Sequence, residues 1–193
     1  MLPFNRFAFK EWAVVCAALD AGRQTIIVRK GGIHEGREGF RVEHGEFWLF
    51  PTRFHQTADE LTADAAPLLV QAQADRPASG LIRFRNYAVV EQIFRLEDER
   101  SLPHLAGLTI LSERTLGERF HYRGPGLFVL AVRVYRLPDP LDVADSPHLA
   151  GCRSWVDLPD DLPTAGLAPV LDETDSRDRL ARLRGALGPI RIA

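Results

Sequence analysis

Long hydrophobic runs and cysteine are scarce in this sequence of 193 residues. No apolar run approaches the ~20 residues that a membrane-spanning helix needs, so we expect no such helix. Residues 1–6 lack the basic stretch, apolar block and cleavage site of a signal peptide, which predicts a cytoplasmic protein. The two cysteines, Cys16 in an apolar run and Cys152 in a later turn, do not suggest a disulfide framework, and we expect two reduced thiols.

Lysine is also scarce, and neither sign of charge is in excess. The formal net charge is −2, so the composition predicts no attraction to nucleic-acid backbones or anionic membranes. Of the 24 lysines and arginines only Lys10 and Lys30 are lysines, which together with abundant Ala, Leu and Pro is typical of a GC-rich bacterial genome. A lysine kept against that bias indicates a need for a compact point charge, which arginine does not imitate. This points to Lys30.

The apolar segments predict an α/β (α+β) protein. Residues 25–29, 47–50 and 127–137 are rich in β-branched or aromatic residues and apolar at odd and even positions alike. Strands of this kind are buried on both faces, so we expect a mixed sheet with helices covering both faces. Residues 12–19 indicate a strand or the end of a helix, followed by a tight turn, and residues 81–96 either two extended pieces or a strand and a short helix.

Helix signals follow at several places. Thr57 to Glu60 has capping-box spacing, a second helix is expected over residues 67–74, and Ser112 is placed to cap a helix that runs to Phe120. Residues 175–187 form an amphipathic pattern that ends at Gly188.

Prolines decide the expected domain organisation. Residues 138–140 are expected to form a proline-rich loop, residues 153–158 a short strand, and residues 159–169 a linker or irregular wrap. We therefore expect one domain over residues 1–158, and a proline-rich wrap with a C-terminal helix over residues 159–193.

The densest group of unusual residues lies between residues 29 and 56. It contains the stretches RKGGIHE from Arg29, EHGEF from Glu43 and FWLFPTRFHQ from Phe47. The sequence resembles a bacterial family of unknown function, DUF1802, whose members share RKGGI-x-E, EH-x-x-F and F-x-LFPT-x-x-HQ. Residues 10–14 and 151–156 also fit, so the resemblance spans roughly residues 8–158. It implies no activity, although some relatives accompany restriction-endonuclease-type domains, which hints at a role in defence.

A fainter resemblance, in layout only, is to the Nudix hydrolases. Those enzymes gather divalent metal on a helix that bears an Arg and several Glu residues. Here the corresponding acids are only Asp59, Glu60 and Asp64, and Pro67 interrupts the helix. We expect a Nudix-like layout without Nudix chemistry.

The candidate site lies at two predicted strand ends. Consecutive glycines let backbone N–H groups approach an anion, and a neighbouring lysine adds charge. Ligands in open α/β sheets favour the carboxyl ends of strands. The predicted ligand-binding residues are Lys30, Gly31, Gly32, Glu35, Glu43, Thr52, His55 and Gln56.

Catalysis finds less support in the sequence. Glu35, Glu43, His44 and His55 could hold a metal or act as acid and base, but they lack tight metal-ligand spacing, and a structural hydrogen-bonded cluster explains them as well. We find no nucleophile elbow, and a cysteine in an apolar run is inert. No acid stands two residues before either lysine, which excludes the usual restriction-nuclease signature.

Nucleic acid is not an expected partner. Arg83, Arg85 and Arg95 could line a strand with Tyr87 available for stacking, but acids over residues 91–99 neutralise the region.

Three hypotheses follow. The first is a non-catalytic binding module for an anionic small molecule or nucleotide, with no metal and with the cofactor unknown. The second is a metal-assisted phosphate or nucleotide hydrolase that uses Glu35, Glu43 and His55. The third is an accessory subunit of a restriction or defence system that binds a protein partner through its C-terminal helix.

Overall fold

The described residues form a seven-stranded mixed sheet with helices on both sides. The computed structural model describes residues 1–30, 42–54, 56–151 and 153–188. The strands are β1 (Phe4–Trp12), β2 (Ile26–Arg29), β3 (Glu46–Thr52), β4 (Leu81–Leu96), β5 (Leu127–Ala144), β6 (Trp155–Pro163) and β7 (Ala168–Pro169). Their order is β2-β5-β4-β3-β1-β6, with β7 paired to β5. The β1–β3 pair is parallel and the other described pairs are antiparallel.

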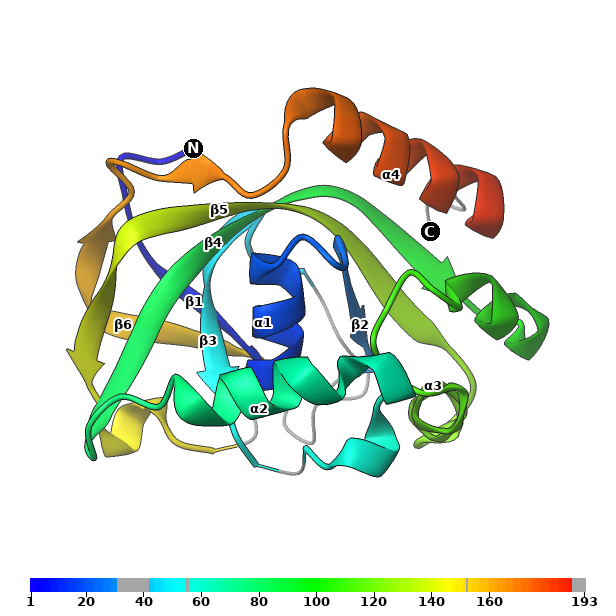
Figure 1. The fold of residues 1–193 in the computed structure, drawn as a ribbon, viewed down its shortest axis with the longest axis horizontal. Coiled ribbons are helices and arrows are strands. Elements are labelled where there is room, and N and C mark those ends of the chain that lie inside the picture. Colours follow the sequence, from blue (N-terminus) through cyan, green and yellow to red (C-terminus); the bar gives the residue numbers. More distant parts are fainter. Residues whose placement is uncertain (31–41, 55, 152, 189–193) are drawn as a thin grey trace.

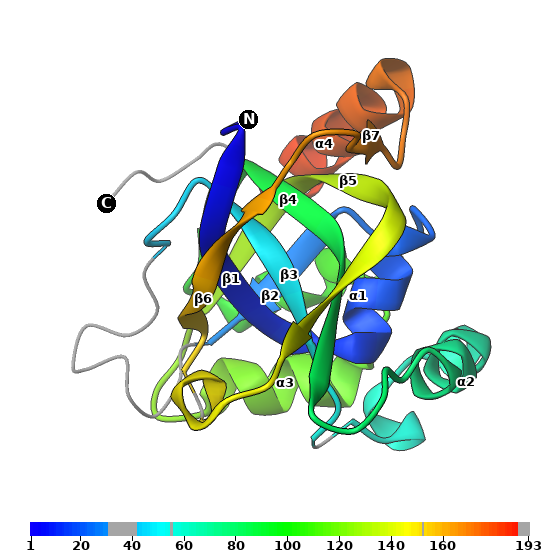
Figure 2. The same ribbon diagram turned by 90° about the vertical axis from the view of Figure 1, so that its left-hand side faces the viewer.

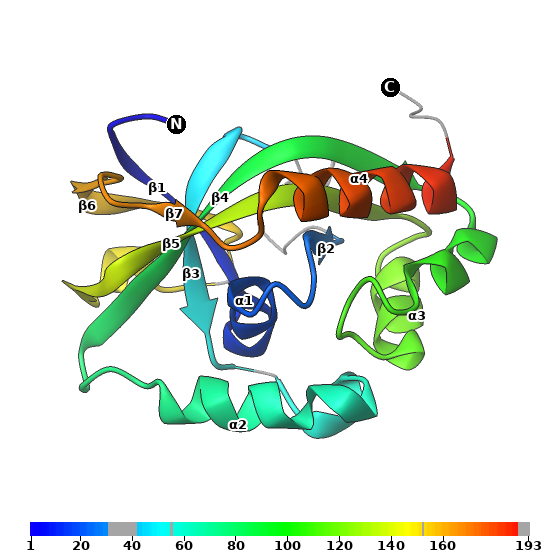
Figure 3. The ribbon, with the colours of Figure 1, turned by 45° about the horizontal axis from the view of Figure 1, so that its top comes forward.

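The helices cover the sheet from different directions. They are α1 (Ala13–Asp20), α2 (Ala66–Ala74), α3 (Glu113–His121) and α4 (Glu173–Leu187), with short 3₁₀ helices η1 (Ala58–Glu60), η2 (Ala63–Ala65), η3 (Glu99–Leu105) and η4 (Pro147–Leu149). Figure 1 shows α4 on one side of the long β4–β5 ribbon and α1 on the other, and Figure 3 shows the same arrangement from above. The expected α/β class, with a mixed sheet and an amphipathic C-terminal helix, is confirmed.

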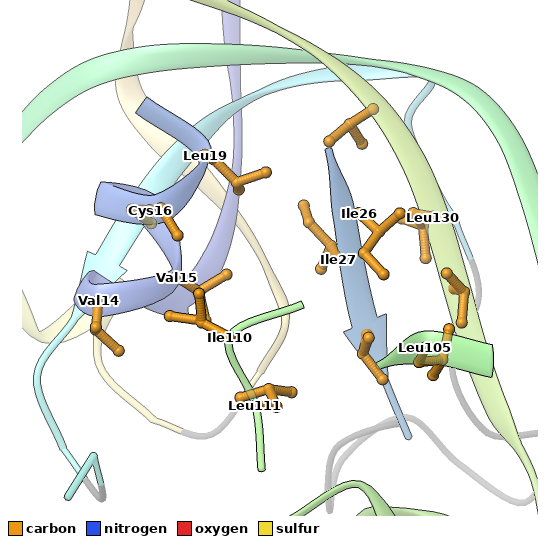
Figure 4. Close-up of a cluster of buried hydrophobic side chains, with 14 of the residues drawn as sticks. Val14, Val15, Cys16, Leu19, Ile26, Ile27, Leu105, Ile110, Leu111 and Leu130 are labelled. Carbon is orange, nitrogen blue, oxygen red and sulfur yellow. The ribbon is translucent and has the colours of Figure 1, made fainter. Parts of the chain in front are cut away.

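The core is divided between the two faces of the sheet. Successive side chains of a strand point to opposite faces, and β3 follows this rule with two apolar sets. Phe47 and Leu49 belong to a large cluster with α1, β2 and β5, whereas Trp48 and Phe50 belong to a smaller cluster with parts of β4 and β6. Figure 4 shows part of the larger cluster, where side chains of α1 face those of β2. The apolar residues at odd and even positions of 47–50 therefore correspond to a central strand that is buried on both faces.

Several predicted elements are confirmed. Residues 25–29, 47–50 and 127–137 fall in β2, β3 and β5, and the expected helices over 67–74 and 175–187 are α2 and α4. Ser112 caps α3, because its hydroxyl accepts a hydrogen bond from the Thr115 N–H at 3.2 Å. Residues 12–19 belong mostly to α1, so the helical alternative holds there.

The proline-rich segments were predicted wrongly. Residues 138–140 are not a loop, because β5 continues to Ala144. Arg136 and Leu141 are paired with β4, whereas the residues between them are not, so the prolines lie in a bulge. Proline lacks a backbone N–H, and in a bulge no hydrogen bond between the strands requires one. Residues 159–163 continue β6, which is an edge strand and so tolerates proline.

Three further segments differ from expectation. Residues 81–96 form one strand of 16 residues rather than two pieces. Thr57 starts only a short 3₁₀ helix, although its N–H does donate to the Glu60 carboxylate at 2.8 Å. The strand β1 was not expected, because its polar residues conceal it. The division into residues 1–158 and 159–193 stays a prediction.

Candidate functional site

Two of the predicted site residues meet where β1 ends and α1 begins. The Thr52 hydroxyl, at the end of β3, donates to the Glu11 carbonyl oxygen at 3.1 Å. The Gln56 Oε1 accepts from the Val14 N–H, in the first turn of α1, at 3.1 Å. β1 and β3 are parallel, with Trp12 paired to Thr52, so both strands end at the same edge of the sheet. These contacts fix the start of α1, whose first N–H groups have no partner within the helix.

A buried carboxylate lies at the same junction. The Glu11 side chain is 1% exposed, and its Oε1 accepts from the Trp12 N–H at 2.7 Å. Its Oε2 lies 3.7 Å from Nη1 of Arg29 and has no hydrogen-bond partner in the described part of the chain. Arg29 also donates to the Ser154 hydroxyl at 2.7 Å, which ties β2 to the segment before β6.

A second guanidinium lies close to this carboxylate. Arg119 of α3 lies over the Trp12 ring at 4.4 Å and donates to the Val28 carbonyl at 3.0 Å. Burial lowers the pKa of Arg119, and the charge of Glu11 opposes that shift. Residues from four of the stretches that resemble the DUF1802 family thus lie close together around Glu11. These stretches are residues 10–14, 29–35, 47–56 and 151–156. The charged groups there are enclosed, and their contacts join strands and helices.

Lys30 makes its contacts elsewhere, at the end of α3. Its ammonium group donates to the carbonyl oxygens of Phe120 at 2.9 Å, of Gly126 at 2.8 Å and of Gly124. Burial lowers the pKa of Lys30. An ammonium has three donors, and three carbonyls occupy them here. Lys30 therefore closes the C-terminus of α3, where carbonyls lack partners within the helix.

The other predicted site residues are less informative. Glu43 is exposed, and its neighbour His44 stacks on Phe7 with ring centroids 3.6 Å apart. Gly31, Gly32, Glu35 and His55 lie outside the described residues. The expected convergence of Lys30, Glu35, Glu43 and His55 stays a prediction.

A cavity of about 330 Å³ lies between α1, α2, β3 and β4. We call it the arginine cavity. Figure 2 shows α1 and α2 close together beside the strands that complete it. One face of α1, one face of α2 and the ends of both strands contribute its lining: Ala13, Cys16, Ala17, Asp20, Leu49, Pro51, Arg53, Gln71, Ala72, Ala74, Asp75, Arg83, Arg85 and Asn86.

Three guanidinium groups of the lining converge on one residue, Asp75, which follows α2. Arg53 donates to the Asp75 carbonyl oxygen at 3.0 Å. Arg83 and Arg85 contact the two carboxylate oxygens at 3.2 and 3.5 Å. Arg83 also donates two shorter hydrogen bonds, of 2.8 Å each, to the Asp142 carboxylate, which lies outside the lining. The arginines have three positive charges against two aspartates in the lining, Asp20 and Asp75.

Arg53 is partly buried. Burial lowers the pKa of its guanidinium, and the nearby charge of Arg76 lowers it further, while Asp75 opposes both. Its Nε is buried, and no described group accepts a hydrogen bond from it. A buried donor without an acceptor is uncommon in native proteins and calls for an explanation. Cys16 also lines the cavity, and burial raises the pKa of its thiol well above its usual range, so this thiol is inert.

Sequence reasoning reached this cavity only in part. The sequence placed part of the candidate site at the strand end that carries Thr52, and the neighbouring Pro51 and Arg53 do line the cavity. Arg83 and Arg85 were considered only as a surface for nucleic acid. Their spacing of two residues on a strand places them on one face, but α2, which completes the cavity, lies there only because of tertiary packing.

In the described part of the chain no three His, Cys, Asp or Glu side chains are grouped so that they could hold a metal ion. Among the same residues no helix is both long and apolar enough to cross a membrane.

The family model described as "Domain of unknown function (DUF1802)" matches residues 8–182. The chain therefore belongs to the DUF1802 family. No curated protein matches its sequence.

Solved structures resemble the fold only distantly. The crystal structure of ASCH from Zymomonas mobilis has a TM-score of 0.41 at 13% identity, covering 91% of this chain and 92% of that chain. A serine-to-alanine mutant of the same Zymomonas mobilis protein has a TM-score of 0.43 at 14% identity, covering 93% of this chain and 98% of that chain. At this level of similarity the ASCH name describes the Zymomonas protein alone. Neither the Nudix-like layout nor the association with restriction systems is supported by these comparisons.

Proposed function

We propose that this protein is a binding module for an anionic small molecule, which it holds in the arginine cavity. The observation that carries the proposal is the convergence of three guanidinium groups, those of Arg53, Arg83 and Arg85, on one cavity. An anionic ligand would accept hydrogen bonds from the donors that face this cavity.

The composition of the lining supports the same conclusion. Arginine presents a planar set of donors that matches carboxylate and phosphate oxygens. Asp142 pairs with Arg83 from outside the lining, so Asp75 is the acidic partner of Arg85 and contacts Arg53 only through its backbone carbonyl. Alanines and Leu49 supply an apolar wall, and Gln71 adds an amide, which suits an organic molecule better than a bare ion.

The size of the cavity limits the ligand. Its volume of about 330 Å³ lies near the lower end of ligand pockets, which span about 300–1,000 Å³. A mononucleotide or a phosphorylated sugar is of suitable size.

Thermal stabilisation of the purified protein tests this proposal. Adenosine 5′-monophosphate, ribose 5-phosphate and pyrophosphate should raise the melting temperature, and uncharged adenosine should not, because the arginines require an anion. Arg53→Gln should abolish the shift. Arg6→Gln is the matched control, since Arg6 pairs with Asp161 on the surface at 2.8 Å and should leave the shift unchanged. Equal stabilisation of both variants would contradict the proposal.

A metal-assisted hydrolase remains the alternative. The same phosphate compounds should be incubated with magnesium or manganese, beside a Glu43→Gln variant. Turnover that this variant abolishes would favour the enzyme over the binding module.

A further inference from the structure

We infer that Asp75 is an internal competitor in the arginine cavity, and that the ligand is a phosphate monoester whose phosphate group takes the place of the Asp75 carboxylate. This inference rests on the proposed function and identifies the position at which the ligand's charge binds. It begins from the contacts of Arg83 and Arg85.

The contacts of Asp75 with the two strand arginines are loose. They measure 3.2 Å to Arg83 and 3.5 Å to Arg85, whereas charge-assisted hydrogen bonds of this kind are usually about 2.7–2.9 Å long. By comparison, Arg83 forms two hydrogen bonds of normal length with Asp142, at 2.8 Å each. Arg83 keeps that anchor when Asp75 leaves, so the departure does not release the arginine.

Asp75 also holds a poor position on its own helix. It follows the last residue of α2 as the C-cap, where the helix dipole disfavours negative charge. Its side chain is 42% exposed and can turn into solvent. Because half-exposed ion pairs contribute little stability, this displacement costs little.

A phosphate group satisfies the arginines better than Asp75 does. Asp75 reaches Arg53 only through its backbone carbonyl, and Arg85 has Asp75 as its charged partner among the described residues. A phosphate monoester presents three oxygens and up to two charges, so it can accept from Arg85, from the Nη1 of Arg83 that Asp75 vacates and from the guanidinium of Arg53 together. The organic part of the molecule then lies along the alanine wall of α1.

A double-mutant cycle on the full chain tests the inference by isothermal titration calorimetry with adenosine 5′-monophosphate. Asp75→Asn removes the competitor and keeps the shape, and it should raise the affinity at least fivefold. In an Arg85→Gln background the same change should alter the affinity less than twofold, because the contested arginine is absent. A mere through-space gain in positive charge would persist in both backgrounds.

Asp161→Asn is the matched control, since this carboxylate also pairs with an arginine, at a distance from the cavity. Its affinity should equal that of the wild type. If the wild type binds the nucleotide through Arg53 but Asp75→Asn gives no gain, the inference fails and the proposed function stands. If no variant binds a phosphate compound, the proposed function fails as well. Binding by Asp75→Asn without binding by the wild type would support competition by Asp75 and would contradict the proposed function of the native protein.

Discussion

At the scale of single residues, the charged side chains of this protein fall into two groups by their use. Lys30, Glu11 and Arg119 have backbone or side-chain partners that join elements of the fold. Arg53 and Arg85 face a cavity with fewer partners than their donors allow. Scarcity in the sequence singled out Lys30 as important, and the structure gives a physical reason: a compact ammonium fits among three carbonyls where a planar guanidinium does not.

Replacing Lys30 by methionine should destabilise the protein without affecting nucleotide binding. The carbonyls of Phe120, Gly124 and Gly126 would lose a shared donor, and we expect the free energy of unfolding to fall by about 1–3 kcal/mol. Urea denaturation followed by circular dichroism measures this. The exposed Arg100→Met serves as control and should change little. Unchanged stability together with lost binding of adenosine 5′-monophosphate would contradict this prediction. It would favour the site predicted from the sequence, in which Lys30 contacts the ligand.

The Cys16 thiol should resist alkylation. Burial raises its pKa, and only the thiolate reacts, so its half-life with iodoacetamide at pH 8 should be many times that of a free thiol. Peptide mapping by mass spectrometry distinguishes Cys16 from Cys152. Rapid labelling of Cys16 in the native protein would show that the wall formed by α1 opens readily.

At the scale of elements, prediction succeeded where a segment's own chemistry decides its structure. Ser112 predicts α3 because a cap is a local hydrogen bond, and residues 47–50 predict a central strand because both faces are apolar. Prediction failed where the neighbouring strand decides. Pro138 lies in a bulge of β5, and Pro163 lies in the edge strand β6. Neither the bulge nor the edge position can be recognised from the residues of the segment itself. The arginine cavity escaped prediction for the same reason, since four elements create it.

The helix α4 is attached by its apolar stripe to the core of its own chain. Leu183 is 2% exposed, Leu180 and Leu187 pack beside it, and Arg184 donates to Gln92 of β4 at 2.7 Å. A protein partner bound through this helix stays a prediction, and it would have to use another face.

Leu183→Ala should therefore lower the free energy of unfolding by about 2–5 kcal/mol, as for other buried leucines. The exposed Arg182→Ala on the same helix turn is the control and should have a small effect. Differential scanning calorimetry compares the two. Equal effects would mean that α4 is held to the sheet weakly and is free to bind elsewhere.

At the scale of the whole molecule, the two ends of the chain depend on each other. Phe4 pairs with Pro163 and Asn5 with Leu162, while β7 pairs with β5. The sequence suggested a boundary at residue 158, yet this position falls inside β6.

A chain that ends at residue 158 should not unfold cooperatively. It would lack the second half of β6 as well as β7 and α4, which leaves Phe4 and Asn5 of β1 without their partners and the apolar neighbours of Leu183 uncovered. A chain that ends at residue 188 should melt close to the full-length protein. Thermal melts by circular dichroism decide between them, and a sharp, near-native transition for the shorter chain would establish residues 1–158 as an independent domain.

The pairing of β1 with β6 also has a consequence for biosynthesis. β1 is synthesised long before β6, so the partner on its outer edge is complete only when residues 155–163 emerge from the ribosome. At about 5–20 residues per second this delay is roughly 8–30 s. During that interval the outer edge of β1, the strand that carries Phe7 and Phe9, lacks its partner, and β3 is the strand that β1 can pair with. The order of translation thus leaves the outer edge of the first strand open until β6 has been made.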